Sequence, residues 1–536
     1  MTSPGVQPIA RFGGGRRHAL LPVLLPVLLA ATLATACGTG SEEAADGAGV
    51  LRILAGSEIK DLEPLLQRAE REAGVQVKLT YTGTLDGAEQ VASGRADGSL
   101  DATWFSSNRY LSLIDGAQAK LSTQTKIMVS PVVLGLNPAK AIELGWKDKP
   151  VTWADIATAA KDGRFSFGMT NPASSNSGFS ALVGVAAALA DADGALSAEQ
   201  VASVTPRLKE FFSAQRLTAG SSGWLADAFA RDSRVDGMVN YESVLLSGGR
   251  PLTLVYPGDG VVSADYPLTL LASAPEAKKT LYGKLTAWLR TPAVQKEIMT
   301  GTNRRPIAGG VPLDQRFGTA QLIELPFPNR RSTADELIAT YLNQVRVPPE
   351  TRFVLDTSGS MKGERIAALR QALVALTGAD TSASGAFTRF SNRESVTMIP
   401  FSGSPRGPVP FTVPAGDPAP VLADIKRFAE GLDAAGGTAI FDSLKAAYDQ
   451  PVTPGHYSSI VLMTDGENTD GTNYADFETY YRSLPEERRH TPTFVVLFGE
   501  SDVEEMRRVA ELTGGAVFDA RSTSLTGVFK EIRGYQ

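Results

Sequence analysis

The sequence predicts an α/β protein with two folded parts, each built on mostly parallel strands that are covered by helices. Short apolar runs alternate with segments whose apolar residues recur at helical spacing, which is the pattern of a parallel sheet with crossover helices. The 536-residue chain is long enough for two or three domains. Pro348 and Pro349 cannot continue the helical pattern before them, so we place a domain boundary at about residues 347–351.

The first part opens with a strand, a helix and a second strand. Residues 51–54 are a short apolar run, Gly56 and Ser57 turn the chain, and apolar residues then recur at helical spacing through residues 59–69. Residues 76–81 alternate as the next strand. Two further strands are predicted at 101–105 and 165–169, and an apolar helix at 179–190.

Polar residues follow several of these strands and could line a ligand cleft. A serine-rich loop before a helix places hydroxyls and free backbone amides at the positive helix end, which suits an oxyanion or a polar solute. Simple capping of the helix by Ser or Asn explains the same local pattern. The candidate ligand-binding residues are Ser57, Ser106, Ser107, Ser174, Ser175, Asn176 and Tyr241.

Residues 51–346 resemble the type II extracellular solute-binding proteins that serve bacterial ABC importers. Beyond the opening strands, the resemblance lies in the run T-N-P-A-S-S-N-S-G-F-S-A-L at 170–182 and in the segments 239–242, 256–257 and 264–268. It implies a periplasmic-binding-protein-like fold, in which two α/β lobes close on a small solute.

The last helix of this first part is predicted to begin at a capping box, Ser332 to Glu336. Apolar residues then share one helical face, which we expect to dock on the first domain: Leu337, Ile338, Tyr341, Leu342 and Val345.

The second part, residues 351–536, alternates strands and helices again. We predict strands at 353–355, 395–401, 460–464 and 493–498, and helices at 366–376, 440–448 and 525–532. Hydroxyls and carboxylates stand at three strand or loop ends, at Asp356, Ser358 and Ser360, at Thr438, and at Asp465. Because such ends gather at one edge of a parallel sheet, we expect these side chains to converge.

These five residues suit a hard divalent cation. Mg²⁺ prefers oxygen ligands and takes only one or two carboxylates. The D-x-S-x-S, Thr and Asp-Gly elements resemble the metal-ion-dependent adhesion site of the von Willebrand factor A (VWA) domain, which has a Rossmann-like doubly wound fold. The resemblance implies that Asp356, Ser358, Ser360, Thr438 and Asp465 bind Mg²⁺, Mn²⁺ or Ca²⁺, and that a partner's carboxylate fills an open position. An EF-hand at 465–471 is rejected, because Glu467 and Thr469 stand where that motif has Asp or Asn.

Residues 1–36 combine arginines, a short apolar stretch and small residues before a cysteine, and this pattern resembles a bacterial lipoprotein signal peptide. Arg11, Arg16 and Arg17 precede an apolar stretch at 19–33, and small residues lead to Cys37, the only cysteine. We predict lipidation of Cys37, a flexible tether over 37–50, and a location on the extracytoplasmic face of the cell membrane. Two prolines in a short apolar stretch disfavour a membrane-spanning helix. General secretion is preferred over twin-arginine export, whose pattern the residues after Arg17 match poorly.

Composition excludes several functions. The net charge of −6 and the absence of a basic cluster with interleaved aromatics disfavour nucleic-acid binding. After the signal peptide only His456 and His490 remain as histidines, neither near a nucleophile motif, so we predict no enzyme. A single cysteine excludes an intramolecular disulfide.

Two functions remain open. The chain is either a binding protein that captures a protein partner through its metal site, or the solute-binding component of an ABC importer with a regulatory VWA domain.

Overall fold

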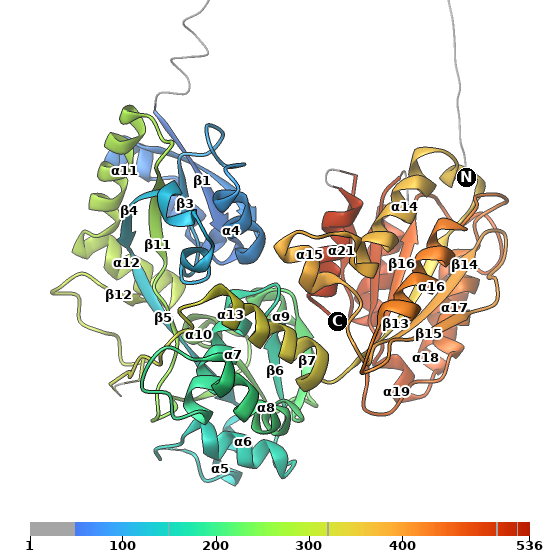
Figure 1. Cartoon of the computed structure of the whole chain (residues 1–536), viewed down its shortest axis with the longest axis horizontal. Coiled ribbons are helices and arrows are strands. Elements are labelled where there is room, and N and C mark those ends of the chain that lie inside the picture. Colours follow the sequence, from blue (N-terminus) through green and yellow to red (C-terminus); the bar gives the residue numbers. More distant parts are fainter. Residues whose placement is uncertain (1–48, 148, 319–320, 500–501, 522–523) are drawn as a thin grey trace, which may run out of the picture. The chain divides into compact units, whose positions relative to one another are not determined.

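The computed structural model describes residues 49–536, apart from 148, 319–320, 500–501 and 522–523. The predicted signal peptide, Cys37 and most of the predicted tether lie outside the described residues. Within them the strands form three sheets, two in residues 50–306 and one in residues 349–519 (Figure 1).

The first sheet has the order β2-β1-β3-β11-β4. β1 pairs in parallel with β2 and β3, whereas β11 pairs antiparallel with β3 and β4. The strands are β1 (Val50–Gly56), β2 (Gln76–Thr82), β3 (Ala102–Trp104), β4 (Leu121–Lys126) and β11 (Pro267–Leu271).

The second sheet has the order β10-β5-β8-β6-β7, and β9 and β12 also pair with β5. Its β6 is parallel to β7 and β8, and β5 is antiparallel to β8. The strands are β5 (Met128–Leu136), β6 (Phe167–Thr170), β7 (Gln215–Ala219), β8 (Gly237–Tyr241), β9 (Thr253–Val255), β10 (Ser263–Ala264) and β12 (Arg305–Pro306). The first domain thus has two α/β lobes, as predicted.

Helices cover both sheets. They are η1 (Ser57–Leu62), α2 (Glu63–Leu66), α3 (Ala69–Ala73), α4 (Thr84–Ala92), η2 (Leu111–Leu113), η3 (Ala117–Lys120), α5 (Pro138–Glu143), α6 (Trp153–Lys161), α7 (Asn176–Leu189), α8 (Ala198–Phe212), α9 (Ser222–Arg231), α10 (Glu242–Ser247), α11 (Glu276–Leu289) and α12 (Pro292–Thr302). The single helix predicted over 59–69 is wrong, because η1, α2 and α3 share that span. Pro64, in the first turn of α2, lacks the N–H that a continuous helix needs there.

The helix before the second domain consists of α13 (Arg331–Thr340) and η4 (Tyr341–Val345). The predicted capping box does not form, because the helix begins before Ser332 and its N-cap is Arg330, which makes no side-chain capping bond. Asp335 accepts hydrogen bonds from the Tyr110 hydroxyl at 2.7 Å and from Arg331 at 3.2 Å. The predicted apolar face does pack into the first domain's core, and Tyr341 donates to Gln215 Oε1 at 3.2 Å.

The third sheet has the order β15-β14-β13-β16-β17-β18, and only β15 pairs antiparallel among the strands described. Its strands are β13 (Pro349–Asp356), β14 (Ser395–Phe401), β15 (Val409–Thr412), β16 (Tyr457–Thr464), β17 (Thr493–Leu497) and β18 (Val517–Asp519). Its helices are η5 (Gly359–Met361), α14 (Glu364–Val374), η6 (Ala375–Ala379), α15 (Ala383–Thr388), α16 (Ala419–Glu430), α17 (Ile440–Asp449), α18 (Tyr474–Ser483), α19 (Glu486–Arg489), α20 (Val503–Thr513) and α21 (Leu525–Arg533).

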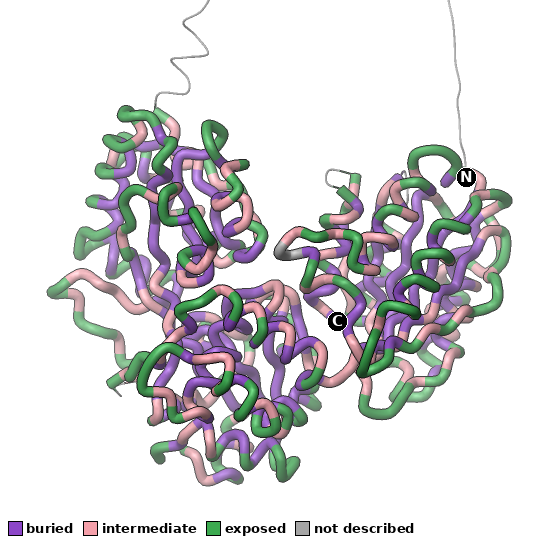
Figure 2. The backbone as a smooth tube through the Cα atoms, viewed as in Figure 1, coloured by how far each residue is buried: buried purple, intermediate pink, exposed green. Residues whose placement is uncertain are grey.

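Both faces of the third sheet are covered, as a doubly wound fold requires. Phe353 and Leu355 enter a core shared with α14, α16 and α21, whereas Val354 enters a core shared with α17, α18 and α20. β13 is therefore buried along its whole length (Figure 2). This explains why residues 353–355 form an apolar run rather than an alternating pattern.

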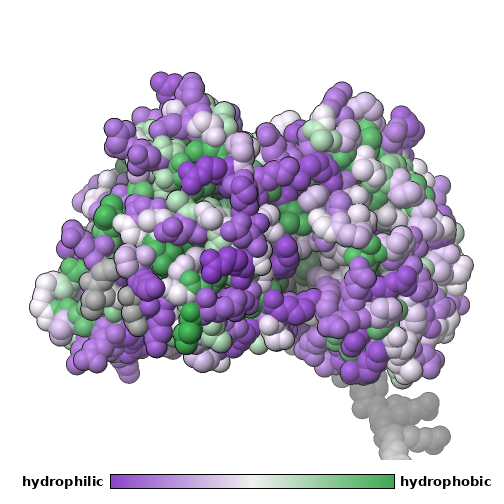
Figure 3. Space-filling view, turned by 90° about the horizontal axis from the view of Figure 1, so that it is seen from below, coloured by the Kyte–Doolittle hydropathy of each residue, from purple (hydrophilic) through white to green (hydrophobic). Residues whose placement is uncertain are grey.

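The surface is mainly polar. Hydrophilic side chains predominate on the face shown in Figure 3, with small hydrophobic patches between them. Within the part of the chain that the structure describes, none of the helices has both the length and the apolar composition that a membrane-spanning segment requires.

Candidate metal centre and solute cleft

The candidate metal centre lies at the carboxyl ends of β13 and β16. These strands are neighbours and run in parallel, with Leu355 opposite Met463. Asp356 ends β13 and Asp465 directly follows β16, so the backbone brings the two carboxylates to one edge of the sheet.

Four of the five predicted ligands form one hydrogen-bonded set. The Ser358 hydroxyl lies 2.9 Å from the Ser360 hydroxyl, which donates to Asp465 Oδ1 at 2.9 Å. Asp356 Oδ1 accepts from the Ser358 amide at 2.8 Å, and Asp356 Oδ2 accepts from the Thr464 hydroxyl at 2.8 Å. The structure thus brings Asp356, Ser358, Ser360 and Asp465 together.

The fifth residue, Thr438, is held beside this set by its loop. The Gly359 amide donates to Gly436 O at 2.8 Å, and the Ala435 amide donates to Thr357 O at 2.8 Å. A Cβ on Gly437 would lie 1.7 Å from Asp470 Oδ2, so a larger residue there would displace the Asp470 carboxylate. The buried Thr438 makes no side-chain hydrogen bond within the described residues, which leaves its hydroxyl available as a ligand.

Burial shapes the electrostatics of this site. Asp356 and Asp465 are both nearly inaccessible to solvent. Burial raises the pKa of Asp356 above its usual value, and the negative charge of Asp465 acts in the same direction. A bound cation would offset both effects, because it stabilises the ionised carboxylates.

The donor set fits a hard cation. It consists of two carboxylates and three hydroxyls, and all of them are oxygen ligands. No group of three or more His, Cys, Asp or Glu side chains suited to a metal occurs among the described residues, so a site rich in histidine or cysteine is not the alternative there.

Three supporting residues were missed by the sequence analysis. Arg365 pairs with Asp465, Thr464 donates to Asp356, and Asp470 accepts from the Thr438 amide at 3.0 Å. Asp470 stands in a loop after a strand, which could have singled it out. The roles of Arg365 and Thr464 depend on contacts between segments about 100 residues apart.

The predicted solute cleft corresponds in part to a cavity of about 450 Å³. Ser57, Ser174 and Ser175 line it, together with Glu58 and the segment 81–86. Lys530, Glu531 and Tyr535 also line it, and sequence reasoning did not assign them to the cleft.

The other four predicted cleft residues are not among those that line this cavity. Ser106 is fully buried, and its carbonyl accepts from the amides of Asp265 and Tyr266. Ser107 instead borders a different hollow. Asn176 and Tyr241 are buried and bond to each other, since the Asn176 amide donates to the Tyr241 hydroxyl at 3.0 Å. The strand-end pattern therefore does not place all of its polar residues in the cleft.

Acidic residues near the cleft have different environments. Burial raises the pKa of Glu58, which lines the cavity. Glu242 is fully buried and does not face solvent, because it forms a bidentate pair with Arg305 at 2.7 Å for both contacts.

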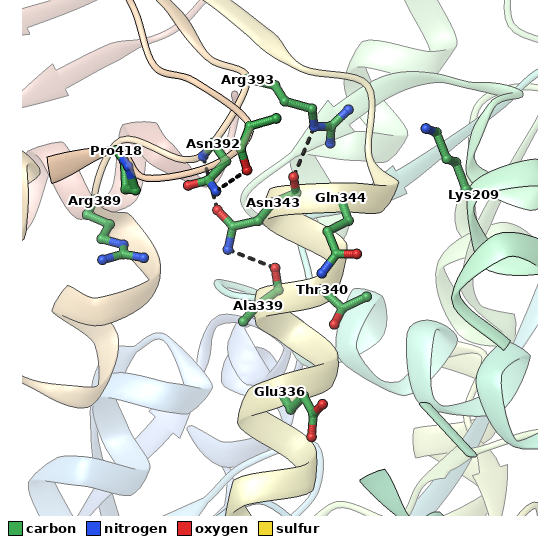
Figure 4. Close-up of a pocket in the computed structure, with 11 residues that line it drawn as sticks. Lys209, Glu336, Ala339, Thr340, Asn343, Gln344, Arg389, Asn392, Arg393 and Pro418 are labelled. Atoms are coloured by element: carbon green, nitrogen blue, oxygen red, sulfur yellow. Dashed lines mark hydrogen bonds between the residues drawn. The ribbon is translucent and has the colours of Figure 1, made fainter. Parts of the chain in front are cut away.

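A shallower hollow of about 610 Å³ contains none of the predicted residues (Figure 4). Asn343 organises it: its side-chain oxygen accepts from the Asn392 amide at 3.0 Å, and its carbonyl accepts from Arg393 Nε at 2.9 Å. The charged or amide side chains Lys209, Glu336, Gln344 and Arg389 that line it are exposed, so the hollow is an open surface feature.

Comparison with protein families finds both predicted domains. Residues 51–299 match the bacterial extracellular solute-binding protein family, and residues 352–531 match the von Willebrand factor type A domain. Inter-alpha-trypsin inhibitor heavy chain H4 is 32% identical in Homo sapiens and 30% in Bos taurus over 133 residues. That stretch is 23% of this chain and 13% of either relative, so the chain matches only a small part of their length.

Periplasmic binding proteins are among the solved structures that resemble this chain. The periplasmic binding protein AfuA from Actinobacillus pleuropneumoniae is 12% identical, with a TM-score of 0.44, and the match covers 55% of this chain and 98% of that one. The ferric binding protein from Campylobacter jejuni is 14% identical, with a TM-score of 0.42, covering 54% and 98%. Such low identities transfer no ligand to this chain.

Proposed function

We propose that this chain, in which a bacterial extracellular solute-binding domain precedes a von Willebrand factor type A domain, is an extracytoplasmic binding protein that captures a protein partner through a divalent cation. The observation that carries the proposal is the hydrogen-bonded set of Asp356, Ser358, Ser360 and Asp465 beside the Thr438 loop.

The cation, when bound, would supply a positive charge with a coordination position open to an incoming carboxylate. Asp356, Ser358 and Ser360 would hold it from the first loop, with Thr438 and Asp465 completing the shell. An Asp or Glu of the partner would be attracted to this open position more strongly than a neutral water, because its negative charge would lie in direct contact with the cation. Because three of the five ligands are neutral hydroxyls, the site would accept the additional negative charge of a partner's carboxylate.

The test is a pull-down from cell-envelope extract with the purified full-length protein. We expect one partner, identified by mass spectrometry, to be recovered in Mg²⁺ and lost in EDTA. Equal recovery in both buffers would contradict metal-dependent capture.

The second candidate function is solute delivery to an ABC permease, with the VWA domain in a regulatory role. The cavity lined by Ser57, Ser174 and Ser175 favours it, since hydroxyls from both lobes face one space. A small polar solute is the ligand that such a lining would bind.

Replacing Ser174 and Ser175 together with alanine tests this second function. In a thermal-shift screen of polar solutes, a solute at a hundred times its Kd stabilises the wild type by about 2.7 kcal/mol. We expect the double variant to bind that solute at least about tenfold more weakly, because two hydroxyl contacts at about 1 kcal/mol each are lost. Ser107→Ala, outside the cavity, is the matched control. If no solute stabilises the wild type, solute delivery is contradicted.

The lipid anchor is a proposal that rests on the sequence, since Cys37 lies outside the described residues. We expect Cys37→Ala to prevent lipidation, so that the protein is released from the membrane fraction or accumulates as an unprocessed precursor. Fractionation with gel mobility checks this. Unchanged membrane retention and unchanged mobility would rule out lipidation at Cys37.

A further inference from the structure

The Asp465 side chain has a cationic partner inside the candidate metal centre. Arg365 Nη1 lies 2.5 Å from Asp465 Oδ2, while Asp465 Oδ1 accepts from Ser360. Both carboxylate oxygens are therefore engaged. Asp356 differs, because its two oxygens accept only from neutral donors, the Ser358 amide and the Thr464 hydroxyl.

The position of Arg365 in its helix is unfavourable for a cation. Arg365 is the second residue of α14, whose N-terminus carries a partial positive charge. Directly before the helix the chain turns at Gly363, whose φ of +84° is a conformation that favours glycine. Arg365 thus stands where a carboxylate would stabilise the helix, and its pairing with Asp465 is the interaction that offsets this.

Arg365 and a bound metal would compete for the Asp465 carboxylate, because both are positively charged. A divalent cation needs the Asp465 oxygens or their water shell, and it repels a guanidinium a few ångströms away. The Arg365 side chain is 41% exposed, so it can swing into solvent when a metal arrives. Asp465 is buried and cannot follow it.

We propose that Arg365 is an internal counter-cation that competes with the divalent metal for Asp465 and so sets the metal affinity of the site. This inference rests on the proposed metal-dependent function. The competition makes partner capture dependent on cation concentration, because the metal must displace Arg365 from Asp465 before it binds.

The test is Mn²⁺ binding to the full-length protein, measured by titration calorimetry and by the loss of the free-ion electron paramagnetic resonance signal. We expect Arg365→Gln to bind Mn²⁺ about fivefold to tenfold more tightly than the wild type, because a nearby like charge has been removed. Arg365→Lys keeps the charge and is expected to stay close to the wild type. Arg370→Gln, on the same helix but paired with Leu432 O and Asp433, is the matched control and should change nothing.

The same variant has an opposite effect without metal. In EDTA, Arg365→Gln should melt slightly below the wild type, because Asp465 loses its partner, and in excess Mn²⁺ its stabilisation by the metal should be larger. If the wild type binds Mn²⁺ and Arg365→Gln binds it equally or more weakly, Arg365 does not compete with the metal, although the metal site itself is supported. No saturable Mn²⁺ binding by either protein would overturn both proposals.

Discussion

Asp356→Ala is expected to abolish binding of Mg²⁺ and Mn²⁺ at millimolar concentrations while the VWA domain stays folded. Asp356 is the first ligand of the proposed site and organises the loop that carries the two serines, because its Oδ1 accepts from the Ser358 amide. Loss of one of only two carboxylates should weaken cation binding by at least about a hundredfold, or about 3 kcal/mol. Calorimetric titration and the metal-dependent pull-down both measure this.

A second substitution separates metal binding from folding. Asp356→Ala removes the carboxylate that accepts from the Ser358 amide and from the Thr464 hydroxyl, and the loss of these two hydrogen bonds costs about 1–3 kcal/mol of stability. Asp356→Asn keeps an acceptor oxygen but removes the charge, so it should fold like the wild type and still fail to bind metal. Partner recovery by both variants equal to that of the wild type, in Mg²⁺ and in EDTA, would show that the partner is held elsewhere.

Much of the fold could be predicted because its signals are local. β14 occupies Ser395–Phe401, the predicted span, since its apolar residues define it without reference to distant residues. β11 was not predicted. It pairs with β3 and β4, which lie some 140 residues or more away, and no local pattern specifies an antiparallel strand inserted between them.

In the candidate sites too, residues whose positions depend on one loop could be predicted, and those that depend on distant segments could not. Asp356, Ser358 and Ser360 lie within five residues of each other, so their convergence depends mainly on one loop. Ser106 follows a strand just as the Ser174 loop does, yet the Asp265–Tyr266 segment covers it and bonds to its carbonyl. Arg365 was missed because its position in a helix does not indicate that it pairs with Asp465, which is 100 residues away in the sequence.

Arg533→Ala is expected to produce the largest loss of stability. Arg533 and Glu394 form a bidentate pair, with Nη1 to Oε1 at 2.5 Å and Nη2 to Oε2 at 2.7 Å. The two side chains are only 5% and 0% exposed. Removing the guanidinium leaves the Glu394 carboxylate buried with the Ser391 amide and hydroxyl as its hydrogen-bond donors, and with the charge of Arg346 close by. Breaking a buried ion pair by removing one partner costs about 3–5 kcal/mol, which lowers the melting temperature of a domain of this size by about 10 °C.

Two comparisons isolate the buried charge as the cause. Arg521→Ala breaks an arginine–aspartate pair whose side chains are 43% and 44% exposed, so calorimetry should show a shift of about 2 °C or less. The double variant Arg533→Met with Glu394→Gln removes both charges of the pair, and it should melt above Arg533→Ala because no buried carboxylate is left without its bidentate guanidinium. If Arg533→Ala melts as the Arg521→Ala control does, water reaches Glu394 in the folded protein and the pair contributes little. If the double variant melts no higher than the single one, the lost packing of the arginine side chain, and not the buried charge, accounts for the destabilisation.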